Sequence, residues 1–310
     1  MAAGRARSTV PARMAPLPLT GHASARPGGG WQAAIMTEED RAPRLALDAA
    51  AVRAAVLAGS ALYTHVEVVG RTGSTNADLL AAAKAGAAAG SVLVAEEQRA
   101  GRGRLDRSWQ SRPGAGLTFS VLLRPAEVPP GGRGWLPLLT GVAVTTALST
   151  QAAVEARLKW PNDVLTETAD GPRKLAGILA EQAGDAIVVG VGLNVSATQQ
   201  ELPPGQATSL LLAGGTNLDR QAILAAVLSE LELWYLRWIA ADRPGDAQAS
   251  GLRAAYLRTC LTVGRDVRVQ LPGGGVLAGH VDDVDDAGRL VVTAPDGVHA
   301  VSAGDVVHVR

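Results

Sequence analysis

The sequence predicts an α+β protein with a large domain followed by a small carboxy-terminal β-barrel. Upstream of Leu261, segments with helical spacing and segments with strand-like spacing follow one another in mixed order, which is typical of an α+β domain. Beyond Leu261, short valine-rich segments alternate with tight-turn sequences, which is typical of an antiparallel barrel of roughly 50 residues. A chain of 310 residues has room for both. We therefore expect an extension over residues 1–40, a catalytic-sized domain over 41–261 and a barrel over 262–310.

The elements of the large domain are predicted from periodicity and capping signals. Thr75 offers its hydroxyl as a cap to the alanine-rich helix that follows, and Asp78 places a negative charge in its first turn. Gly73-Ser74-Thr75-Asn76 therefore lies at a strand-to-helix corner. The expected helices are 45–57, which Gly59 ends, 77–89, one that includes 141–148, 221–239, and one that ends near Cys260; the expected strands are 63–69, 91–95, 117–123, 156–160, 174–181 and 186–195.

The barrel is predicted from three valine-rich segments and the turns between them. The segments are 267–269, 290–292 and 306–309, and the turns are Pro272-Gly273-Gly274-Gly275, Asp286-Ala287-Gly288 and Pro295-Asp296-Gly297. Proline, glycine and aspartate favour tight turns, so strands joined in this way pair antiparallel. We expect the barrel to help bind a ligand or partner without forming the innermost pocket, because the polar candidates all precede it.

The amino-terminal extension lacks hydrophobic periodicity. Its first 35 residues hold four arginines and no acidic residue. We expect this extension to be disordered. An arginine-rich transit peptide has the same composition, but we favour the interpretation that the assigned translation start lies too far upstream and that the protein begins at Met36. No pair of periodic helices precedes residue 45, so we predict no helix-turn-helix and no repression of transcription.

Composition and charge exclude several classes of protein. Cys260 is the single cysteine, which excludes an intramolecular disulfide framework and a cysteine-rich zinc site and favours the cytoplasm. The most apolar long stretch, residues 222–241, is interrupted by charged residues, so no membrane span is predicted. Beyond residue 35, 25 basic residues face 29 acidic ones, which argues against a general nucleic-acid binder.

The most informative segment is an arginine-rich loop over residues 99–112. Five arginines are interleaved there with Gly101 and Gly103, which allow close approach of the backbone to a ligand, so the segment has the parts of an anion cradle. It is not a dinucleotide fingerprint, because Leu105-Asp106 stands in place of the third glycine, and no phosphate-binding P-loop occurs in the chain. An exposed basic surface loop is the alternative.

Other candidates lie at strand ends. Asp163 in Lys159-Trp160-Pro161-Asn162-Asp163 could ligate Mg²⁺ beside phosphates, or this segment could be a structural turn. Lys174 opens an apolar strand, where a lysine is usually solvated. Gly190 and Gly192 precede Asn194 in another apolar strand, and glycines there indicate close approach of a ligand or backbone.

Five motifs occur in one order along the chain: Gly73-Ser74-Thr75-Asn76, Gln98-x-Ala100-Gly101-Arg102-Gly103-Arg104, Lys159-Trp160-Pro161-Asn162-Asp163, Lys174-Leu175-Ala176-Gly177-Ile178-Leu179 and Gly190-Val191-Gly192-Leu193-Asn194-Val195. Together they resemble the bacterial biotin protein ligases, in the form without a DNA-binding domain. The likeness covers about residues 45–310 and departs at Leu105-Asp106, where many relatives have a pair that ends in Gly. It implies a mixed-sheet domain of the class II aminoacyl-tRNA synthetase and biotin ligase fold, followed by an SH3-like barrel.

The resemblance implies a two-step reaction. Biotin and ATP give biotinyl-5′-AMP and pyrophosphate, and a lysine of a biotin carboxyl carrier protein then takes the biotinyl group as an amide. Mg²⁺ accompanies ATP, with Asp163 as its expected ligand. The implied compartment is the cytoplasm, and neither DNA nor a membrane is an expected partner.

The implied roles follow the charge of each substrate. An uncharged ureido ring suits short polar side chains, whereas joining a carboxylate to a phosphate requires cations and N–H groups. Trp109 is expected either as an apolar lid or as a core residue. The implied catalytic residues are Lys174 and Arg104; the biotin-binding residues are Ser74, Thr75, Asn76, Gln98, Arg102, Gly103, Arg104 and Lys174; the ATP-binding residues are Arg102, Arg104, Asn162 and Asn194.

Two other functions remain open from the sequence. A lipoate protein ligase runs the same adenylation and transfer on a related fold, but the arginine loop and the polar cluster oppose it. A nucleic-acid-binding regulator would use the arginine loop on phosphates, and the slightly acidic charge beyond residue 35 and the lack of a recognition helix oppose that reading.

Overall fold

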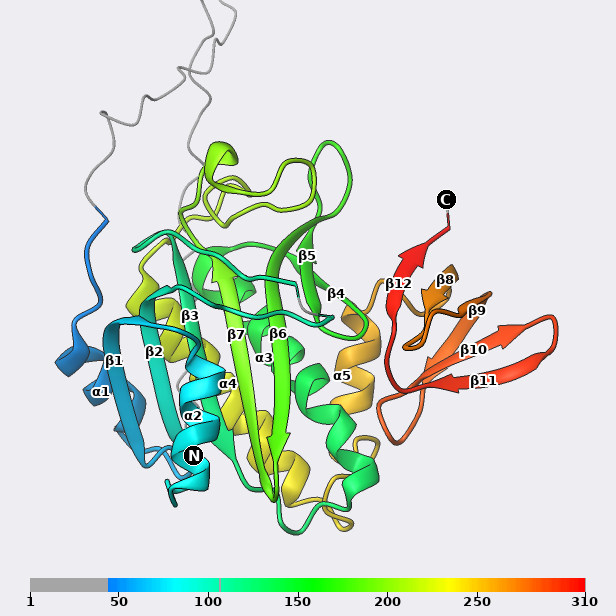
Figure 1. Ribbon diagram of the computed structural model, residues 1–310, viewed down its shortest axis with the longest axis horizontal. Helices are drawn as coiled ribbons and strands as arrows, with labels where there is room; N and C mark the ends of the chain where they lie inside the picture. The colour runs from blue at the N-terminus through cyan, green and yellow to red at the C-terminus, as the bar shows by residue number, and fades with distance from the viewer. Residues whose placement is uncertain (1–43, 106, 310) are drawn as a thin grey trace, which may run out of the picture. The chain divides into compact units, whose positions relative to one another are not determined.

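A seven-stranded mixed sheet forms the centre of the computed structural model, which describes residues 44–105 and 107–309 (Figure 1). The predictions for residues 1–40 lie outside the described residues. The strands β1 (His65–Thr72) and β2 (Ser91–Gln98) run parallel and are joined through α2 (Thr75–Lys84), and the other neighbouring strands run antiparallel. In sheet order the strands are β1 (His65–Thr72), β2 (Ser91–Gln98), β3 (Gly116–Leu123), β7 (Ala186–Asn194), β6 (Arg173–Ala183), β5 (Asp163–Thr166) and β4 (Ala156–Lys159).

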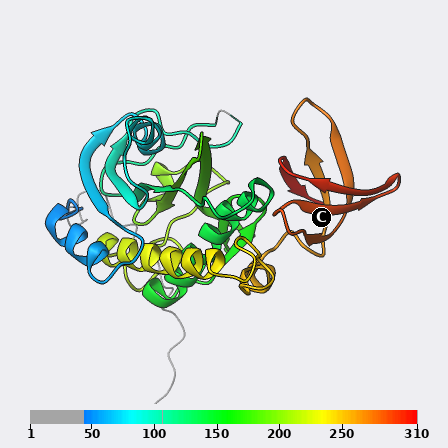
Figure 2. The same ribbon diagram turned by 90° about the horizontal axis from the view of Figure 1, so that it is seen from below.

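Helices cover both faces of this sheet. The main core gathers residues of α3 (Trp135–Ala152) and α4 (Arg220–Ile239) against one face, and a smaller core lies between α2 and the other face (Figure 2). The remaining helices are α1 (Ala49–Leu57), α5 (Leu252–Thr259) and the short 3₁₀ turns η2 (Pro130–Gly134) and η3 (Gln199–Glu201).

The two-residue period of β3 decides which side chains reach the α2 face. Phe119 and Val121 belong to the main core, whereas Leu122 belongs to the core beneath α2. Ser120 therefore points to the α2 face, because residues two apart share one face of a strand. This places a hydroxyl in a strand that is buried along its whole length.

A second, five-stranded antiparallel sheet follows α5. Alternate residues such as Val267 and Val269 are buried, and they join the same hydrophobic cluster as the main core. Two tryptophans of the large domain contact the turn between β9 and β10: Trp135 Nε1 donates to the carbonyls of Asp285 and Asp286, and Trp160 Nε1 donates to that of Gly288. In sheet order the strands are β11 (Gly297–Val301), β10 (Leu290–Ala294), β9 (Val276–Val284), β8 (Asp266–Gln270) and β12 (Asp305–His308).

The α+β class, the mixed sheet and the carboxy-terminal antiparallel sheet are confirmed. The prediction that Thr75 caps α2 is wrong: Ser74 is the N-cap, and its Oγ accepts from the Ala77 N–H at 3.4 Å. The helix also stops at Lys84 instead of continuing to residue 89, because Gly86 adopts a φ of 94°.

Three strands, β5, β9 and β11, were not predicted. β9 and β11 bury few of their residues, so the sequence of each strand shows no clear alternation of apolar and polar residues. The domain division at residue 262 stays a prediction. Among the described residues, no helix is long and apolar enough to cross a membrane.

Candidate functional site

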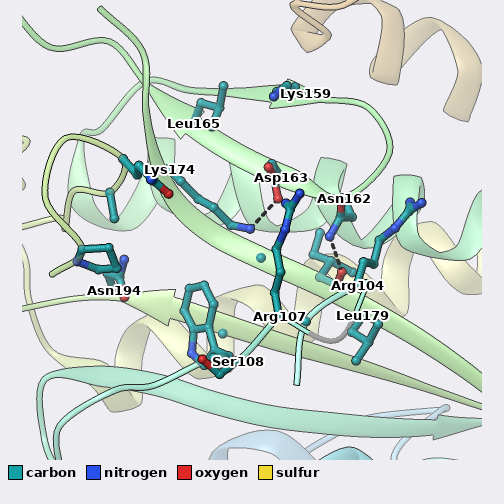
Figure 3. Close-up of a pocket in the computed structure, with 18 of the residues that line it drawn as sticks. Arg104, Arg107, Ser108, Lys159, Asn162, Asp163, Leu165, Lys174, Leu179 and Asn194 are labelled. Atoms are coloured by element: carbon teal, nitrogen blue, oxygen red, sulfur yellow. Dashed lines mark hydrogen bonds and ion pairs between the residues drawn. The ribbon is translucent and has the colours of Figure 1, made fainter. Parts of the chain in front are cut away.

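A pocket of about 1200 Å³ opens over the α2 face of the large sheet (Figure 3). Its wall is formed by the start of α2, the end of β2, the arginine loop, the strands β5 to β7 and the carboxy-terminal sheet. Every site residue predicted from the sequence lies on this wall: Ser74, Thr75, Asn76, Gln98, Arg102, Gly103, Arg104, Asn162, Asp163, Lys174 and Asn194. The tertiary structure therefore brings together residues that are separated by up to 120 positions in the sequence.

One end of the pocket is a neutral, hydrogen-bonded cluster. Gln98 Oε1 accepts from the backbone N–H of Thr75 at 2.8 Å and lies 3.0 Å from its hydroxyl. Ser120 Oγ lies 2.7 Å from Thr75 Oγ1 and 2.6 Å from Asn76 Oδ1. Asn76 Nδ2 donates to the Leu179 carbonyl at 3.1 Å. These side chains orient one another, because each buried polar group needs a partner.

Glycines make the floor beside this cluster. A Cβ on Gly190 would overlap Asn76 Oδ1, and a Cβ on Gly192 would overlap the Trp109 ring. Both positions therefore require glycine, which agrees with the close approach that the sequence indicated. Trp109 lies in the pocket wall rather than in the core, and its buried Nε1 has no hydrogen-bond partner in the described structure. A ligand in the pocket could supply that partner.

The other end of the pocket is cationic. Lys174 Nζ lies 2.6 Å from Asp163 Oδ1 and 5.8 Å from the centre of the Trp109 ring (Figure 3). β6 pairs with β5 through Lys174 and Ala176 but skips Leu175, and this bulge turns Lys174 to the face that carries Gly177. The lysine at the strand end therefore points into the pocket.

The arginine loop folds back on itself as a short hairpin. The Gly103 N–H donates to the Arg107 carbonyl, and the Trp109 N–H donates to the Gly101 carbonyl at 2.8 Å. Leu105 lies near the tip with a φ of 54°, a left-handed conformation that is uncommon for residues other than glycine. Gly101 is required, because a Cβ there would overlap the Trp109 carbonyl.

Three arginines of this loop contact two other parts of the protein, β6 and the carboxy-terminal sheet. Arg102 Nη2 lies 3.0 Å from Glu181 Oε1. Arg104 Nη2 donates to the Gly304 carbonyl at 3.3 Å, and Arg107 is paired with Asp305. Burial lowers the pKa of Arg104, while the carboxylates of Asp163 and Asp305 act in the opposite direction. The carboxy-terminal sheet thus contacts the loop through β12 and the residue before it.

The two predicted asparagines also hold the backbone of the site. Asn162 Nδ2 donates to the Ile178 carbonyl at 3.0 Å, and Asn194 Nδ2 donates to the Thr208 carbonyl at 2.9 Å. Asn162 lies in the turn between β4 and β5 and also lines the pocket. The structure is therefore compatible with both interpretations of this motif, a structural turn and a ligand-binding segment.

The donor set fits a metal ion that enters with a ligand better than a resident one. Among the described residues, no group of three His, Cys, Asp or Glu side chains could hold a metal ion. Asp163 offers a single carboxylate to the pocket. Mg²⁺ bound to phosphates needs only one or two carboxylates, so Asp163 is compatible with it.

Sequence reasoning missed several residues that line the pocket or contact its lining residues. Ser120 is fully buried, and its only signal was a hydroxyl within an apolar strand. Glu181 was seen as the end of a strand and given no role. Asp305 and His308 come from the carboxy-terminal sheet, and burial together with the positive charges of Lys159 and Arg265 lowers the pKa of His308 to about 4.

Two family models match the chain. The model of the biotin/lipoate A/B protein ligase family matches residues 69–196, and the model of the biotin protein ligase C-terminal domain matches residues 262–309. The fold and the pocket therefore define a ligase of the biotin and lipoate class.

Individual relatives narrow this class. The biotin–[acetyl-CoA-carboxylase] ligase of Mycobacterium tuberculosis is 44% identical over 279 residues, which cover 89% of this chain and 100% of the relative. The bifunctional ligase/repressor BirA of Bacillus subtilis is 30% identical over 225 residues, 70% of this chain and 66% of that protein. A solved structure of the biotin protein ligase from Aquifex aeolicus in complex with biotin and ATP matches with a TM-score of 0.65 and 28% identity, and covers 80% of this chain and 100% of the other. The chain belongs to the biotin protein ligase family, so the resemblance seen in the sequence is confirmed.

Proposed function

We propose that this protein is an ATP-dependent biotin protein ligase, which converts biotin to biotinyl-5′-AMP and transfers the biotinyl group to a lysine of a carrier protein. One observation carries the proposal: a single pocket joins a buried, neutral hydrogen-bonding end to an exposed cationic end. Biotin has the same polarity, with an uncharged ureido ring at one end and a carboxylate at the other. The relatives named above support the same activity.

The neutral end suits the ureido ring. Thr75, Asn76 and Gln98 line the pocket and offer donors and acceptors without net charge, and the buried Ser120 contacts Thr75 and Asn76. Ser74 contributes less freely, because its Oγ already caps α2. The dithiolane ring of lipoate has no N–H or carbonyl, so it would leave any polar group that turns toward the ligand without a partner. Such a site rejects an analogue that lacks the hydrogen-bonding groups.

The cationic end suits adenylation. A biotin carboxylate oxygen attacks the α-phosphorus of ATP, a C–O–P linkage forms, and the bond to pyrophosphate breaks with its electron pair leaving on pyrophosphate. Negative charge gathers on the α-phosphate, and Lys174, Arg102 and Arg104, which line the pocket, would stabilise it. Asp163 would hold a Mg²⁺ ion that enters with ATP, and the ion would neutralise part of the charge of ATP.

We assign ATP to the region of Asn162 and Asn194, with Asn194 near the adenine or the phosphates and Asn162 near ATP or its metal. Both amides hold backbone through Nδ2, which fixes the walls near β5 and β7 and leaves ATP to bind against preformed segments. In the second step the acceptor amine attacks the acyl carbon, AMP leaves, and the product is an amide. Trp109 would exclude water from the mixed anhydride in the interval.

Because the chain belongs to the biotin protein ligase family, the acceptor that we propose is a biotin carboxyl carrier protein or domain. The cytoplasmic location favoured by the single cysteine stays a prediction, as does the absence of transcriptional repression.

The decisive experiment uses the purified full chain with [α-³²P]ATP and either biotin or lipoate. We expect labelled acyl-adenylate when biotin is added and little when lipoate is added. No labelled acyl-adenylate should form when neither carboxylic acid is present. Addition of a biotin carboxyl carrier domain should then release labelled AMP and give a carrier that binds streptavidin. Labelled adenylate formed with lipoate but not with biotin would assign the chain to the lipoate branch instead.

A further inference from the structure

Glu181, near the end of β6, connects the two ends of the pocket. Its Oε2 accepts from Asn76 Nδ2 at 2.9 Å, and its Oε1 lies 3.0 Å from Arg102 Nη2. Asn76 belongs to the neutral cluster at the start of α2, and Arg102 belongs to the arginine loop. A single carboxylate therefore bridges two segments that otherwise bind different halves of the ligand.

The register of β6 places this carboxylate on the pocket side. Gly177, Leu179 and Glu181 alternate along the strand and share a face, and both Gly177 and Leu179 line the pocket. The bulge at Leu175 turns Lys174 to the same face. One strand thus presents a cation toward the phosphate end and an anion toward the neutral end.

The charge of Glu181 argues against direct contact with substrate. A carboxylate would repel both biotin and ATP, and each of its oxygens is engaged by a protein group. Its partner Arg102 uses one Nη2 for this contact, and a guanidinium has five N–H donors in a rigid fork. The rest of the fork is available to an anionic ligand.

We propose that Glu181 is a positioning residue that acts through Arg102, an inference that rests on the proposed biotin ligase function. It holds the guanidinium so that its remaining donors face the biotin carboxylate and the developing α-phosphate charge. Arg102 is half exposed, and an exposed ion pair adds little to stability. The benefit lies in orientation, because a long side chain that is already placed loses less conformational freedom when the ligand binds.

The test is E181Q in the full chain. Glutamine keeps the size of the side chain and can still accept from Asn76 Nδ2, but it removes the charge that holds Arg102. We expect kcat/KM for biotinyl-AMP formation to fall roughly tenfold, mostly through KM for biotin, as for the loss of one charge-assisted hydrogen bond. The melting temperature should not change, and trypsin should cut the arginine loop faster. The matched control is D185N, which removes an ion-paired carboxylate at the far end of the β6–β7 hairpin.

A double-mutant cycle separates positioning from a general structural role. In an R102A background, E181Q should have no further effect, because the residue through which it acts is gone. R102K keeps the charge and loses the fork, so it should reproduce the rise in KM even if E181Q folds poorly. Equal effects of E181Q with and without Arg102 would overturn the proposal.

The outcomes also separate this inference from the function on which it rests. A wild-type chain that makes no biotinyl-AMP would contradict the proposed function, whatever the variants do. An active wild type with an E181Q variant of unchanged KM and unchanged trypsin sensitivity would overturn only the role of Glu181. Tighter biotin binding by E181Q would also overturn it, because Glu181 would then be a competitor for Arg102.

Discussion

The two ends of the pocket hold their side chains by opposite means. At the neutral end, Thr75, Asn76 and Ser120 are buried and form a continuous set of hydrogen bonds. At the cationic end, Arg102 and Lys174 are partly exposed and are held by single ion pairs. The same cavity therefore contains a rigid region and an adaptable one.

This difference indicates how the work is divided between the ends. A buried hydrogen-bonded cluster loses stability when one partner is removed, so it can select a ligand by the penalty for an unpaired group. An exposed ion pair contributes little stability and can be exchanged for a phosphate or carboxylate at small cost. Selection is expected at the neutral end, and chemistry at the cationic end.

The largest expected effect comes from Lys174 at the cationic end. Lys174→Ala should lower the rate of biotinyl-AMP formation by about 10²–10³, the usual cost of one transition-state donor, and leave the melting temperature near wild type. Arg104→Ala should act on the same step. Given synthetic biotinyl-AMP, Lys174→Ala should recover much of its transfer activity, because transfer does not require the α-phosphate to be attacked.

Lys84→Ala, at the last turn of α2, is the control for the loss of a lysine outside the pocket. Single-turnover adenylation at saturating ATP is the measurement. A normal rate for Lys174→Ala would identify Lys174 as a strand-end lysine without a catalytic role.

The next effect is structural and lies at the neutral end. Gly190→Ala places a Cβ where Asn76 Oδ1 now lies, so the amide must move and its bond with Ser120 is lost. We expect the free energy of unfolding to fall by about 1–3 kcal/mol, as for overpacking, and biotin binding to weaken. Gly70→Ala, which meets no atom within 4 Å, should leave both unchanged. Urea unfolding and calorimetric titration with biotin would show whether the neutral end is as rigid as the contacts indicate.

A smaller effect is expected where the carboxy-terminal sheet meets the arginine loop. Asp305→Asn removes the partner of Arg107, a contact that is partly exposed and worth about 0–1 kcal/mol. KM for ATP should rise by up to about fivefold, and the difference should shrink at high salt because ions screen exposed pairs. Asp296→Asn, at an exposed turn of the same sheet, serves as the control. A salt-independent or much larger effect would show that Asp305 acts as more than an exposed partner.

The smallest effect concerns pH. The pKa of His308 is lowered from 6.5 to about 4, so the folded protein keeps this imidazole neutral where the unfolded chain would protonate it. Its contribution to stability is therefore complete above pH 6.5 and is lost as pH falls toward 4. After allowance for its partial exposure, the loss should be no more than about 1 kcal/mol.

His308→Asn should remove this loss, so the variant should be less sensitive than wild type to a change from pH 7.5 to pH 5 in urea unfolding. His299→Asn, an exposed histidine paired with Asp296, should not. Bound ATP should oppose the loss, because phosphate charge near His308, Lys159 and Arg265 favours the protonated ring. Identical pH profiles for both variants would show that burial of His308 has no energetic consequence.

The sequence by itself was enough to predict the class of fold and a set of residues that line the pocket. Helical and strand periodicity is local, so α4, β3 and β7 could be located from their own residues. The arginine loop was visible because five arginines and two glycines fall in one short segment. Lys174 could be named only through the order of the five motifs, since a lysine at a strand end carries no signal of its own.

The tertiary structure decided which of these residues meet. Ser120 and Thr75 are 45 residues apart, Asn76 and Glu181 are 105 apart, and Arg107 and Asp305 are 198 apart. Neither the sheet order that places β7 between β3 and β6, nor the bulge that turns Lys174 into the pocket, follows from local spacing. Propensity and periodicity act over a few residues, whereas a binding site is assembled by long-range strand pairing and packing, and for this reason Glu181 and Ser120 acquired a role only in the folded chain.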